Sequence, residues 1–487
     1  MIYIDEYSPT PLYQQIYEQF KGAIKSGDLV FGEKLPATRA LASRLCISRN
    51  TVESAYQQLL EEGYVQSRVG SGFAVSDLVG EIPPKGAKSP PKSPGEYCGD
   101  LKTGAEDPYE SRYPPVRYDF QFKNLSHGFF PHKLWRKYTS QLLSDFEGRD
   151  LTPYHDQQGE RGLRLEISKY LYRLRGIECD VDQIVIRGGL EFALETVGDL
   201  LPPEYRHVGM EEPGYDSARL VFEKRRFKIT PIRIYPRYDY LDDLECFAPQ
   251  ILFLTPAHQF PTGRIMTAAM RGQVLEWADR TGGYIIEDDY GSEYRYNSKP
   301  IPALQSFGHD ERVIYLGSFF KPLSPGLRLN FLVLPKPLVP LYHQAHPWLN
   351  PAAAWLQQAT LALFMRDGQL EKHLRKTLRQ CKMRHDRLIE ALGEHLGDRA
   401  EVIGANAGLH LMLRVPGAKS QEELVGQARR QGVRIYPTTP YWMDPGACPP
   451  DTVLLGYAQL DADDIDNAVL GLKNAWFRDH SPKSAQL

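Results

Sequence analysis

The sequence predicts a multi-domain protein with a small N-terminal α+β domain, a linker and a large C-terminal α/β domain. Its 487 residues exceed what one hydrophobic core usually holds. Pro, Gly, Ser and Lys crowd residues 80–115, a composition that cannot bury enough apolar surface to fold. After this stretch, strand and helix patterns alternate, as in a largely parallel sheet. We expect domains at residues 1–79 and 116–487, with 80–115 as a flexible linker.

Composition restricts the class of protein further. The chain has 58 Lys and Arg against 61 Asp and Glu, a net charge of -3, so any DNA-binding part must be local. The six cysteines lie far apart without a C-x-x-C pair, and no metal site is predicted. The N-terminus, MIYIDEYSPT, has no signal pattern, and no apolar run is long enough to cross a bilayer. We expect a cytoplasmic protein.

The N-terminal domain has three predicted helices. Apolar residues recur at helical spacing from Leu12 to Ile24, and Gly27 is expected to end the first helix. A second helix is expected in KLPATRALASRL, with Pro36 in its first turn. A third is expected in SRNTVESAYQQLLEEGY, with Ser48 as its N-cap.

Two strand patterns follow, at residues 64–69 and 73–75, and meet at a Gly-Ser-Gly hairpin turn. Helix, helix, tight turn, helix and β-ribbon in this order predict a winged helix-turn-helix, whose third helix enters the major groove of DNA with its first turn. Residues opening that helix would contact base edges, and nearby arginines would contact phosphates. The predicted DNA-contacting residues are Arg49, Asn50 and Thr51 at base edges, Arg39, Arg44 and Arg68 at phosphates, and the capping residue Ser48.

The stretch LVFGEKLPATRALASRLCISRNTVESAYQQLLEEGYVQSRVGSGFAV resembles the DNA-binding domain of the GntR family almost residue for residue. The likeness runs from the G-x-x-LP entry to the G-x-G wing. One position departs, because that family usually has Gly in the turn where Cys46 stands. A left-handed conformation costs a non-Gly residue about 1–2 kcal/mol, so we expect a slightly different turn.

Six strands are predicted in the C-terminal domain, and function in such sheets sits at their carboxyl ends. The candidate strands cover residues 183–186, 207–210, 251–254, 284–286, 313–316 and 331–334. The segments that follow the first five strands read RGGLE, EEPGY, TPAHQFPTGR, EDDYGSEYRY and GSFFKPLSPGLR. Together they offer an amine, an acid, aromatic rings, hydrogen-bond donors and an anion site.

This set of groups is what pyridoxal phosphate (PLP) requires. The cofactor needs a lysine for its imine, a carboxylate for its pyridine nitrogen and an aromatic ring against its own. Its phosphate suits a helix N-terminus, hydroxyls and an arginine. Each residue alone is more often solvated or packed than functional. Their combination at the ends of successive strands favours the cofactor.

The C-terminal segment also resembles the fold-type I aminotransferases, through YHDQQGERGLRLEISKYL, EEPGY, PAHQFPTG, EDDY and a K-x-x-x-x-x-x-R spacing, in that order. The resemblance implies a PLP-dependent aminotransferase-like α/β fold over nearly the whole domain. It also assigns residues: Lys321 to the Schiff base, Arg328 to the phosphate with Ser318 and the amides of Gly189 and Leu190, Asp288 to the pyridine nitrogen, Tyr290 to the phenolic oxygen, Tyr215 to stacking, and His258 or Gln259 beside the ring.

Three positions depart from the aminotransferase pattern. Leu190 stands where Ser or Thr is usual, and Phe320 where a Ser commonly precedes the lysine. Both changes remove hydroxyl donors near the phosphate, so cofactor binding is expected to be weaker unless Arg187 compensates. The strand TVLLGYAQL lacks the arginine that usually binds the substrate carboxylate, and Arg414 and Arg434 are only nearby in sequence.

A GntR-type reader joined by a long linker to an aminotransferase-like domain is the organisation of the MocR subfamily of bacterial regulators, which this chain resembles. The resemblance implies a head-to-tail homodimer that binds promoter DNA and senses PLP, an amino compound or both. Two alternatives stay open. One is a working PLP-dependent aminotransferase that carries a DNA-binding domain. The other is a domain that has lost its cofactor.

Overall fold

The computed structural model describes residues 2–5, 8, 10–68, 72–76, 115–122, 125, 127–145, 156–237, 239–296, 302–307, 311–345 and 353–477. The chain divides into two compact units, Met1–Thr103 and Gly104–Leu487. Residues 80–114 of the predicted linker, the middle of the predicted wing turn at 69–71 and the first two residues of YHDQQG lie outside the described residues. No described helix is long and apolar enough to cross a membrane.

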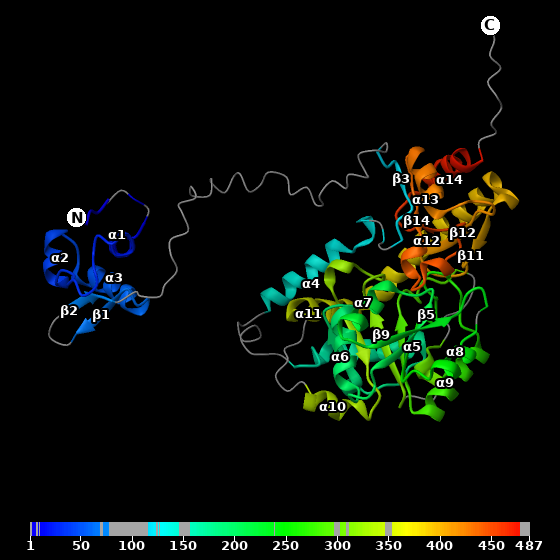
Figure 1. The fold of residues 1–487 in the computed structure, drawn as a ribbon, viewed down its shortest axis with the longest axis horizontal. Helices are drawn as coiled ribbons and strands as arrows, with labels where there is room; N and C mark the ends of the chain where they lie inside the picture. The colour runs from blue at the N-terminus through cyan, green and yellow to red at the C-terminus, as the bar shows by residue number, and fades with distance from the viewer. Residues whose placement is uncertain are drawn as a thin grey trace, which may run out of the picture. The chain divides into compact units, whose positions relative to one another are not determined.

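The N-terminal unit is a winged helix-turn-helix, as predicted. It comprises α1 (Leu12–Ser26), α2 (Thr38–Arg44), α3 (Arg49–Glu61), β1 (Val65–Arg68) and β2 (Gly72–Val75) (Figure 1). The two strands pair antiparallel, with Val65 opposite Val75. The predicted apolar faces of α1 and α3 meet in one core around Ile16, Phe20 and Tyr56. Gly27, in the left-handed conformation, ends α1.

Two expectations for this unit were wrong. Cys46 adopts the left-handed conformation itself, with φ 56°, so the turn between α2 and α3 keeps the geometry usually given to Gly. The turn is held because the Ile47 amide donates to the Ala42 carbonyl at 3.1 Å, a bond that closes a helix end. Pro36 lies before α2, which begins at Thr38. Its carbonyl accepts a hydrogen bond from the Tyr56 hydroxyl at 3.0 Å.

The C-terminal unit is built on a seven-stranded sheet, whose strands run in the order β4-β10-β9-β8-β7-β5-β6. Only β10 is antiparallel to its neighbours; the remaining pairs are parallel. The largely parallel sheet is therefore confirmed, and it includes a strand, β6, that the sequence pattern did not reveal. The bounds are β4 (Ile184–Arg187), β5 (His207–Glu212), β6 (Lys228–Arg233), β7 (Ile251–Leu254), β8 (Tyr284–Asp289), β9 (Val313–Ser318) and β10 (Asn330–Val333).

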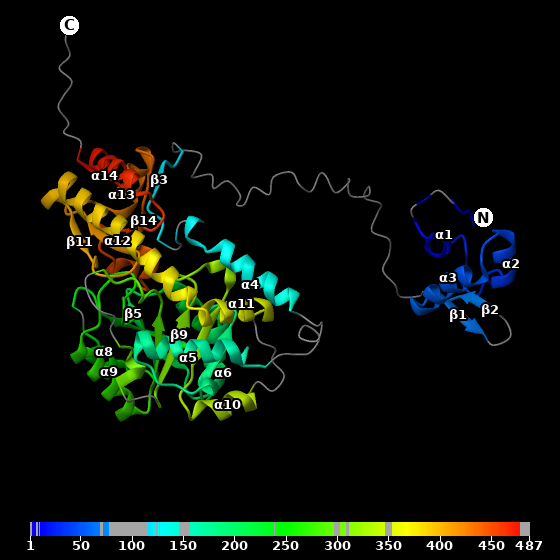
Figure 2. The ribbon, with the colours of Figure 1, turned by 180° about the vertical axis from the view of Figure 1, so that it is seen from behind.

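Helices cover both faces of this sheet. Side chains alternate along each strand, so Ile184 and Ile186 enter one core and Val185 enters the other. One face packs against α6 (Leu190–Leu200), α7 (Asp216–Lys224) and α10 (Leu338–Ala345). The other packs against α4 (His132–Ser144), α5 (Arg161–Arg175), α8 (Leu241–Phe247), α9 (Ala268–Thr281) and α11 (Trp355–Arg366) (Figure 2). The result is a three-layer α/β domain.

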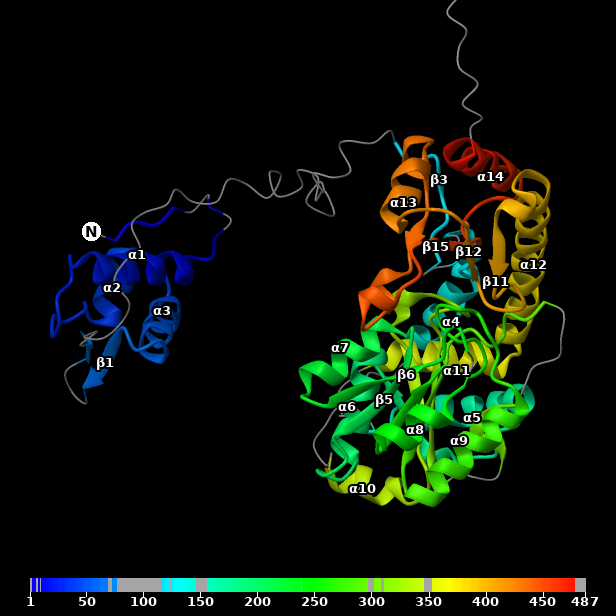
Figure 3. The ribbon, with the colours of Figure 1, turned by 45° about the vertical axis from the view of Figure 1, so that its right-hand side comes forward.

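The rest of this unit forms a second sheet with its own helices, which lie at one end of the domain in Figure 3. The strand order is β11-β12-β15-β14, and all pairs are antiparallel. The strands are β11 (Glu401–Ile403), β12 (His410–Arg414), β15 (Thr452–Gly456) and β14 (Tyr436–Pro437). The helices are α12 (Gln369–His395), α13 (Gln421–Arg430) and α14 (Ala462–Trp476), and a short pair joins β3 (Tyr118–Asp119) to β13 (Val433–Arg434).

Candidate functional site

The carboxyl ends of the parallel strands open into a cavity of about 330 Å³. Its lining draws on segments that follow β4, β5, β7, β8 and β9, together with residues from the second sheet. Seven of the residues that the sequence assigned to a cofactor line this cavity: Leu190, Tyr215, Asp288, Tyr290, Ser318, Lys321 and Arg328. Gly189, His258 and Gln259 lie outside the lining.

Lys321 stands in the loop that follows β9. Its backbone is fixed from one side, because the Tyr294 hydroxyl donates to the Lys321 carbonyl at 3.0 Å. The side chain reaches the cavity, where its Nζ donates to the Phe122 carbonyl at 2.8 Å. A fixed backbone with a primary amine facing a cavity suits capture of an aldehyde.

Asp288 is a buried carboxyl at the end of β8, facing the same cavity. Within the described part of the chain, no donor or cation bonds to its side chain. Burial raises the pKa of Asp288 to about 8, and the nearby carboxylates of Asp289 and Glu211 contribute to the shift. A cationic N–H placed against this carboxyl would restore its ionised form.

Tyr290 and His258 form a pair beside the Lys321 loop. The Tyr290 hydroxyl lies 3.1 Å from His258 Nδ1. Burial lowers the pKa of His258 to about 3, with a further contribution from the charge of Lys321, so the ring is neutral at physiological pH. His258 therefore lies behind Tyr290 and can orient its hydroxyl without adding charge.

Gln259 does not reach the cavity. It is fully buried, and its amide nitrogen donates to the carbonyl of Pro213 at 2.9 Å. Its amide oxygen accepts from the Thr262 hydroxyl at 2.5 Å. These bonds tie the segment after β7 to the segment after β5. The Gln259 side chain therefore stabilises the fold and does not face the cavity.

One end of the cavity is suited to an anion. Gly189 is the N-cap of α6, and a Cβ at this position would lie 2.3 Å from a terminal nitrogen of Arg328. Glycine therefore lets the guanidinium approach the helix N-terminus, where backbone amides favour negative charge. In this structure the Glu191 carboxylate lies there, 2.8 Å from the Arg328 guanidinium. Ser318 also lines the cavity, and its hydroxyl accepts a hydrogen bond from the Phe320 amide at 3.0 Å.

The three other arginines considered from the sequence do not line the cavity. Arg187 is buried, and its guanidinium donates to the Thr196 hydroxyl at 2.8 Å and to the Ile186 carbonyl at 2.9 Å. It therefore does not replace the missing hydroxyl donors. Arg414 pairs with Asp451 at 2.9 Å, and Arg434 lies 3.9 Å from Asp119.

The sequence did not reveal that part of the cavity lining is an aromatic wall. Phe122, Phe260 and Tyr441 line the cavity, and the rings of Phe260 and Tyr441 pack edge to face with centroids 4.7 Å apart. Only Phe260 belongs to a motif, PAHQFPTG, that could have indicated it. His410 lies on β12, in the second sheet, and no local pattern marked it. Glu191 was visible in RGGLE but had no assigned role.

In the N-terminal unit, four of the predicted DNA-contacting residues lie at the start of α3: Ser48, Arg49, Asn50 and Thr51. The Ser48 hydroxyl accepts from the Thr51 amide at 3.1 Å, which caps the helix and orders its first turn. Arg49 and Asn50 are exposed directly after it, and Arg49 pairs with Glu53 at 2.9 Å. Arg39 and Arg44 are exposed on α2. For Arg68, at the end of β1, the side chain lies outside the described part of the structure.

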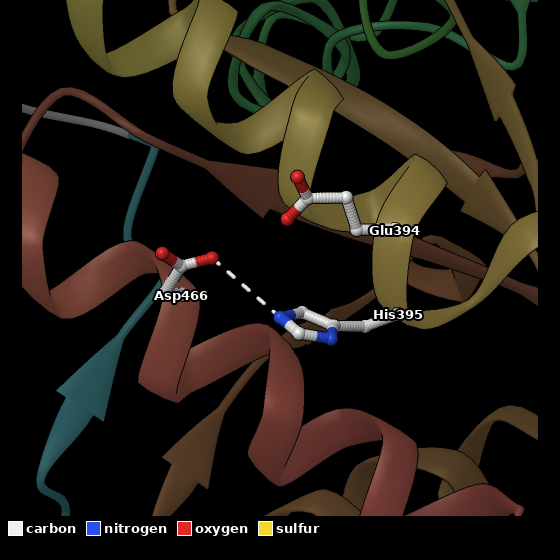
Figure 4. A group of neighbouring side chains, drawn as sticks. All are labelled: Glu394, His395 and Asp466. Carbon is white, nitrogen blue, oxygen red and sulfur yellow. Dashed lines mark ion pairs between the residues drawn. The ribbon is translucent and has the colours of Figure 1, made fainter.

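One surface cluster combines potential metal ligands, Glu394 and His395 on α12 with Asp466 on α14 (Figure 4). The His395 ring is turned toward Asp466, with 3.5 Å between Nε2 and a carboxylate oxygen. The guanidinium of Arg387 also pairs with Asp466 and lies 3.7 Å from Glu394. Because this cation offsets the carboxylates, the cluster is an ion-pair network that joins α12 to α14.

Comparison with known families matches both units. Residues 12–75 match the model for bacterial regulatory proteins of the gntR family, and residues 123–472 match that for class I and II aminotransferases. The chain is 35% identical over 474 residues to the HTH-type transcriptional regulator YhdI of Bacillus subtilis, covering 97% of each chain. It is 31% identical to the probable rhizopine catabolism regulatory protein MocR of Rhizobium meliloti, covering 98% of this chain and 96% of that one.

Among solved structures, the fold is similar to that of LysN, an α-aminoadipate aminotransferase from Thermus thermophilus. The two share a TM-score of 0.64 and 24% identity, over 73% of this chain and 91% of LysN. At this identity the likeness establishes the fold alone.

Proposed function

The chain belongs to the MocR subfamily of GntR-type transcriptional regulators, and on that premise we propose that it controls DNA binding by sensing PLP, an amino compound, or both in the cavity of its C-terminal unit. The regulator itself follows from the family. The proposal concerns the ligand and the residues that hold it.

The residues of the cavity fit PLP group by group. Lys321 presents a primary amine for an aldehyde, and the unpartnered Asp288 carboxyl suits a protonated pyridine nitrogen. Arg328 at the N-terminus of α6, with Ser318, suits a phosphate. Tyr290 is placed to donate to a phenolic oxygen, and Tyr215 offers its ring for stacking. When bound, PLP supplies an aldehyde and an electron-withdrawing ring.

The observation that carries the proposal is the meeting of Lys321, Asp288 and Arg328 in one cavity. Asp288 lies on β8, and Lys321 and Arg328 lie in the segment after β9, 33 and 40 positions further along the chain. A solvated lysine or a structural carboxyl does not require these partners. Asp288 in particular has a raised pKa and no bonded partner among the described residues, an arrangement common where a ligand completes the site.

For DNA, we assign Arg49, Asn50 and Thr51 at the start of α3 to base edges. They are held by the Ser48 cap and lie off the apolar face of the helix, whose buried residues include Val52 and Tyr56. Arg39, Arg44 and Arg68 are assigned to phosphates, which position the protein without reading sequence.

The test is a gel shift with the full-length protein and the promoter region of its own gene, with and without PLP and a panel of amines. A change in affinity or in the footprint with PLP or an amine supports sensing. Identical DNA binding under all conditions would contradict the proposal. Lys321→Ala is the matched variant, because it keeps the DNA-binding unit and removes the amine.

The first alternative, a working aminotransferase, makes a different prediction. It requires steady transfer of an amino group between an amino acid and a keto acid, lost in Lys321→Ala. Such turnover together with ligand-independent DNA binding would favour the enzyme over the sensor.

A further inference from the structure

Phe122, Phe260 and Tyr441 form an aromatic wall of the cavity, and among the described lining residues the only cationic side chains are those of Lys321 and Arg328. From this wall we propose that the effector is a primary amine with an apolar or aromatic body and no carboxylate. The inference rests on the proposed function, because it takes Lys321 and a bound cofactor as the place where the amine is recognised. It goes further by naming the chemical class of the effector.

Seventeen of the described residues line the cavity, and six of these are Phe or Tyr. Phe260 is their centre, with ring centroids 4.7 Å from Tyr441, 5.6 Å from Tyr215 and 6.0 Å from Phe122. Such edge-to-face and tilted packing leaves ring faces and edges for a flat apolar group. Behind this wall lies Leu454, fully buried in β15 and part of the same cluster. The strand that usually carries the carboxylate-binding arginine therefore contributes a leucine to an apolar core.

Among the described residues, only Lys321 and Arg328 line the cavity with positive charge. Lys321 is the amine that would hold the cofactor, and Arg328 lies at the phosphate end beside Glu191. Arg414 is paired with Asp451 outside the cavity. Among the residues that the structure describes, no guanidinium is therefore left at the aromatic wall for a second anion.

The two histidines near the wall do not supply a cation either. Burial lowers the pKa of His410 well below its usual range, and the neighbouring His258 lowers it further. His410 Nε2 lies 3.2 Å from the Pro261 carbonyl, which can only accept, so this nitrogen carries the proton and Nδ1 is an acceptor. A neutral ring with a bare acceptor does not attract a carboxylate.

The acidic residues strengthen the argument. Glu191 and Asp216 line the cavity as well, whereas Asp288 and the two cations are already assigned to the cofactor. A carboxylate brought to this wall would lose its water without gaining a cationic partner, which is unfavourable. An amine with an uncharged body avoids that cost. Its ammonium form is attracted by the acidic lining and by the aromatic faces before it reaches Lys321.

The experiment compares two probes that differ only in a carboxylate, 2-phenylethylamine and L-phenylalanine. Full-length protein is first loaded with PLP, and loading is verified by the visible absorbance band and by borohydride fixation on Lys321. Each probe is then titrated, and its dissociation constant is taken from the change in that band. We expect 2-phenylethylamine to bind at least about tenfold more tightly, and only this probe to alter DNA binding at matched concentration.

A matched pair of variants tests the wall itself. Tyr441→Arg adds a cation to the lining and is expected to reverse the preference in favour of L-phenylalanine, whereas Tyr441→Leu removes the ring without adding charge and is not. Equal or tighter binding of L-phenylalanine to the unmodified protein overturns the inference, as does the failure of both probes to bind loaded protein. If PLP is not retained at all, the proposed function fails first. The comparison in the unmodified protein decides the matter even where Tyr441→Arg does not fold.

Discussion

On α3, the side chains assigned to DNA stand in water, whereas the groups assigned to PLP in the C-terminal unit are largely withdrawn from it. Arg49 and Asn50 are exposed, and the nearest ion pair of Arg49 is one helical turn away. Asp288 and His258 are buried, and burial moves the pKa of the first to about 8 and of the second to about 3. A substitution on α3 should therefore affect only the contacts of the substituted side chain. A substitution in the cavity should also change the protonation of neighbouring groups.

Exposed groups keep their ordinary charge and exchange water for a ligand at modest cost. Buried groups keep their charge only when a partner is present, so in the cavity ligand binding and protonation are linked. A sensor benefits from the second situation, because a ligand that changes charge inside the cavity also changes the stability of the surrounding fold.

The largest expected effect comes from removing the amine of Lys321. Lys321→Ala should lower PLP affinity by at least about 100-fold, since no other amine lines the cavity among the described residues. The readouts are the visible absorbance band and borohydride fixation. Lys336→Ala, at an exposed lysine after β10 that does not line the cavity, is the control. Retention of a fixed adduct in Lys321→Ala would place the cofactor elsewhere.

The second effect is a change in how stability depends on pH. Folded protein without PLP holds a proton on Asp288 up to about pH 8, and an unfolded chain releases it above about pH 4. The free energy of unfolding therefore falls as pH rises through this window, by at most about 1.4 kcal/mol per pH unit from this group. Asp288→Asn removes this contribution, so the Tm of PLP-free variant should fall less between pH 5 and pH 8.

The exposed Asp398 provides the control for that measurement, as Asp398→Asn makes the same chemical change at the surface. A pH dependence in Asp288→Asn equal to that of the unmodified protein would show that the buried carboxyl does not respond to pH as described.

The third effect concerns the exposed residues at the start of α3. Arg49→Ala should weaken DNA binding by about 1–3 kcal/mol and relax the preference at one base position. PLP affinity and Tm should be unchanged, because the Arg49 side chain is exposed and its pairing with Glu53 is a surface contact. The measurement is fluorescence anisotropy on a set of single-base operator variants. Arg136→Ala, an exposed arginine on α4, controls for the loss of charge.

The same contrast explains what could be predicted from the sequence. The fold of the N-terminal unit follows from local signals: the apolar stripe that starts at Leu12, the stop at Gly27 and the cap at Ser48. At Cys46 a local rule was misleading, because hydrogen bonds at the helix end hold the left-handed turn against the preference of the residue.

In the cavity, strand ends identified Lys321 and Asp288, because parallel strands bring their carboxyl ends together. The aromatic wall was not predicted, because Phe122, His410 and Tyr441 come from distant parts of the chain. Only the packing of the second sheet against the first brings them together. No role was predicted for Glu191, for a different reason. A glutamate in the first turn of a helix is ordinary, and only the approach of Arg328 gives it a role.

The smallest expected effect concerns this glutamate, which is half exposed and therefore lies between the two extremes. The Glu191 and Arg328 side chains are 51% and 48% exposed, so their ion pair contributes about 0–1 kcal/mol. A phosphate that binds Arg328 at the N-terminus of α6 has to compete with this carboxylate. Glu191→Gln keeps the size of the side chain and removes its charge, so PLP affinity should rise by about two- to fivefold, and more at low salt.

Equilibrium titration of the cofactor band at two salt concentrations measures this gain. Glu195→Gln makes the same change one turn along α6, at a residue that does not line the cavity, and should leave PLP affinity unchanged. Weaker binding in Glu191→Gln would mean that the carboxylate orients Arg328 for the phosphate instead of competing with it. In that case the charge of a half-exposed residue would support ligand binding in the cavity, as the charges of the buried residues do.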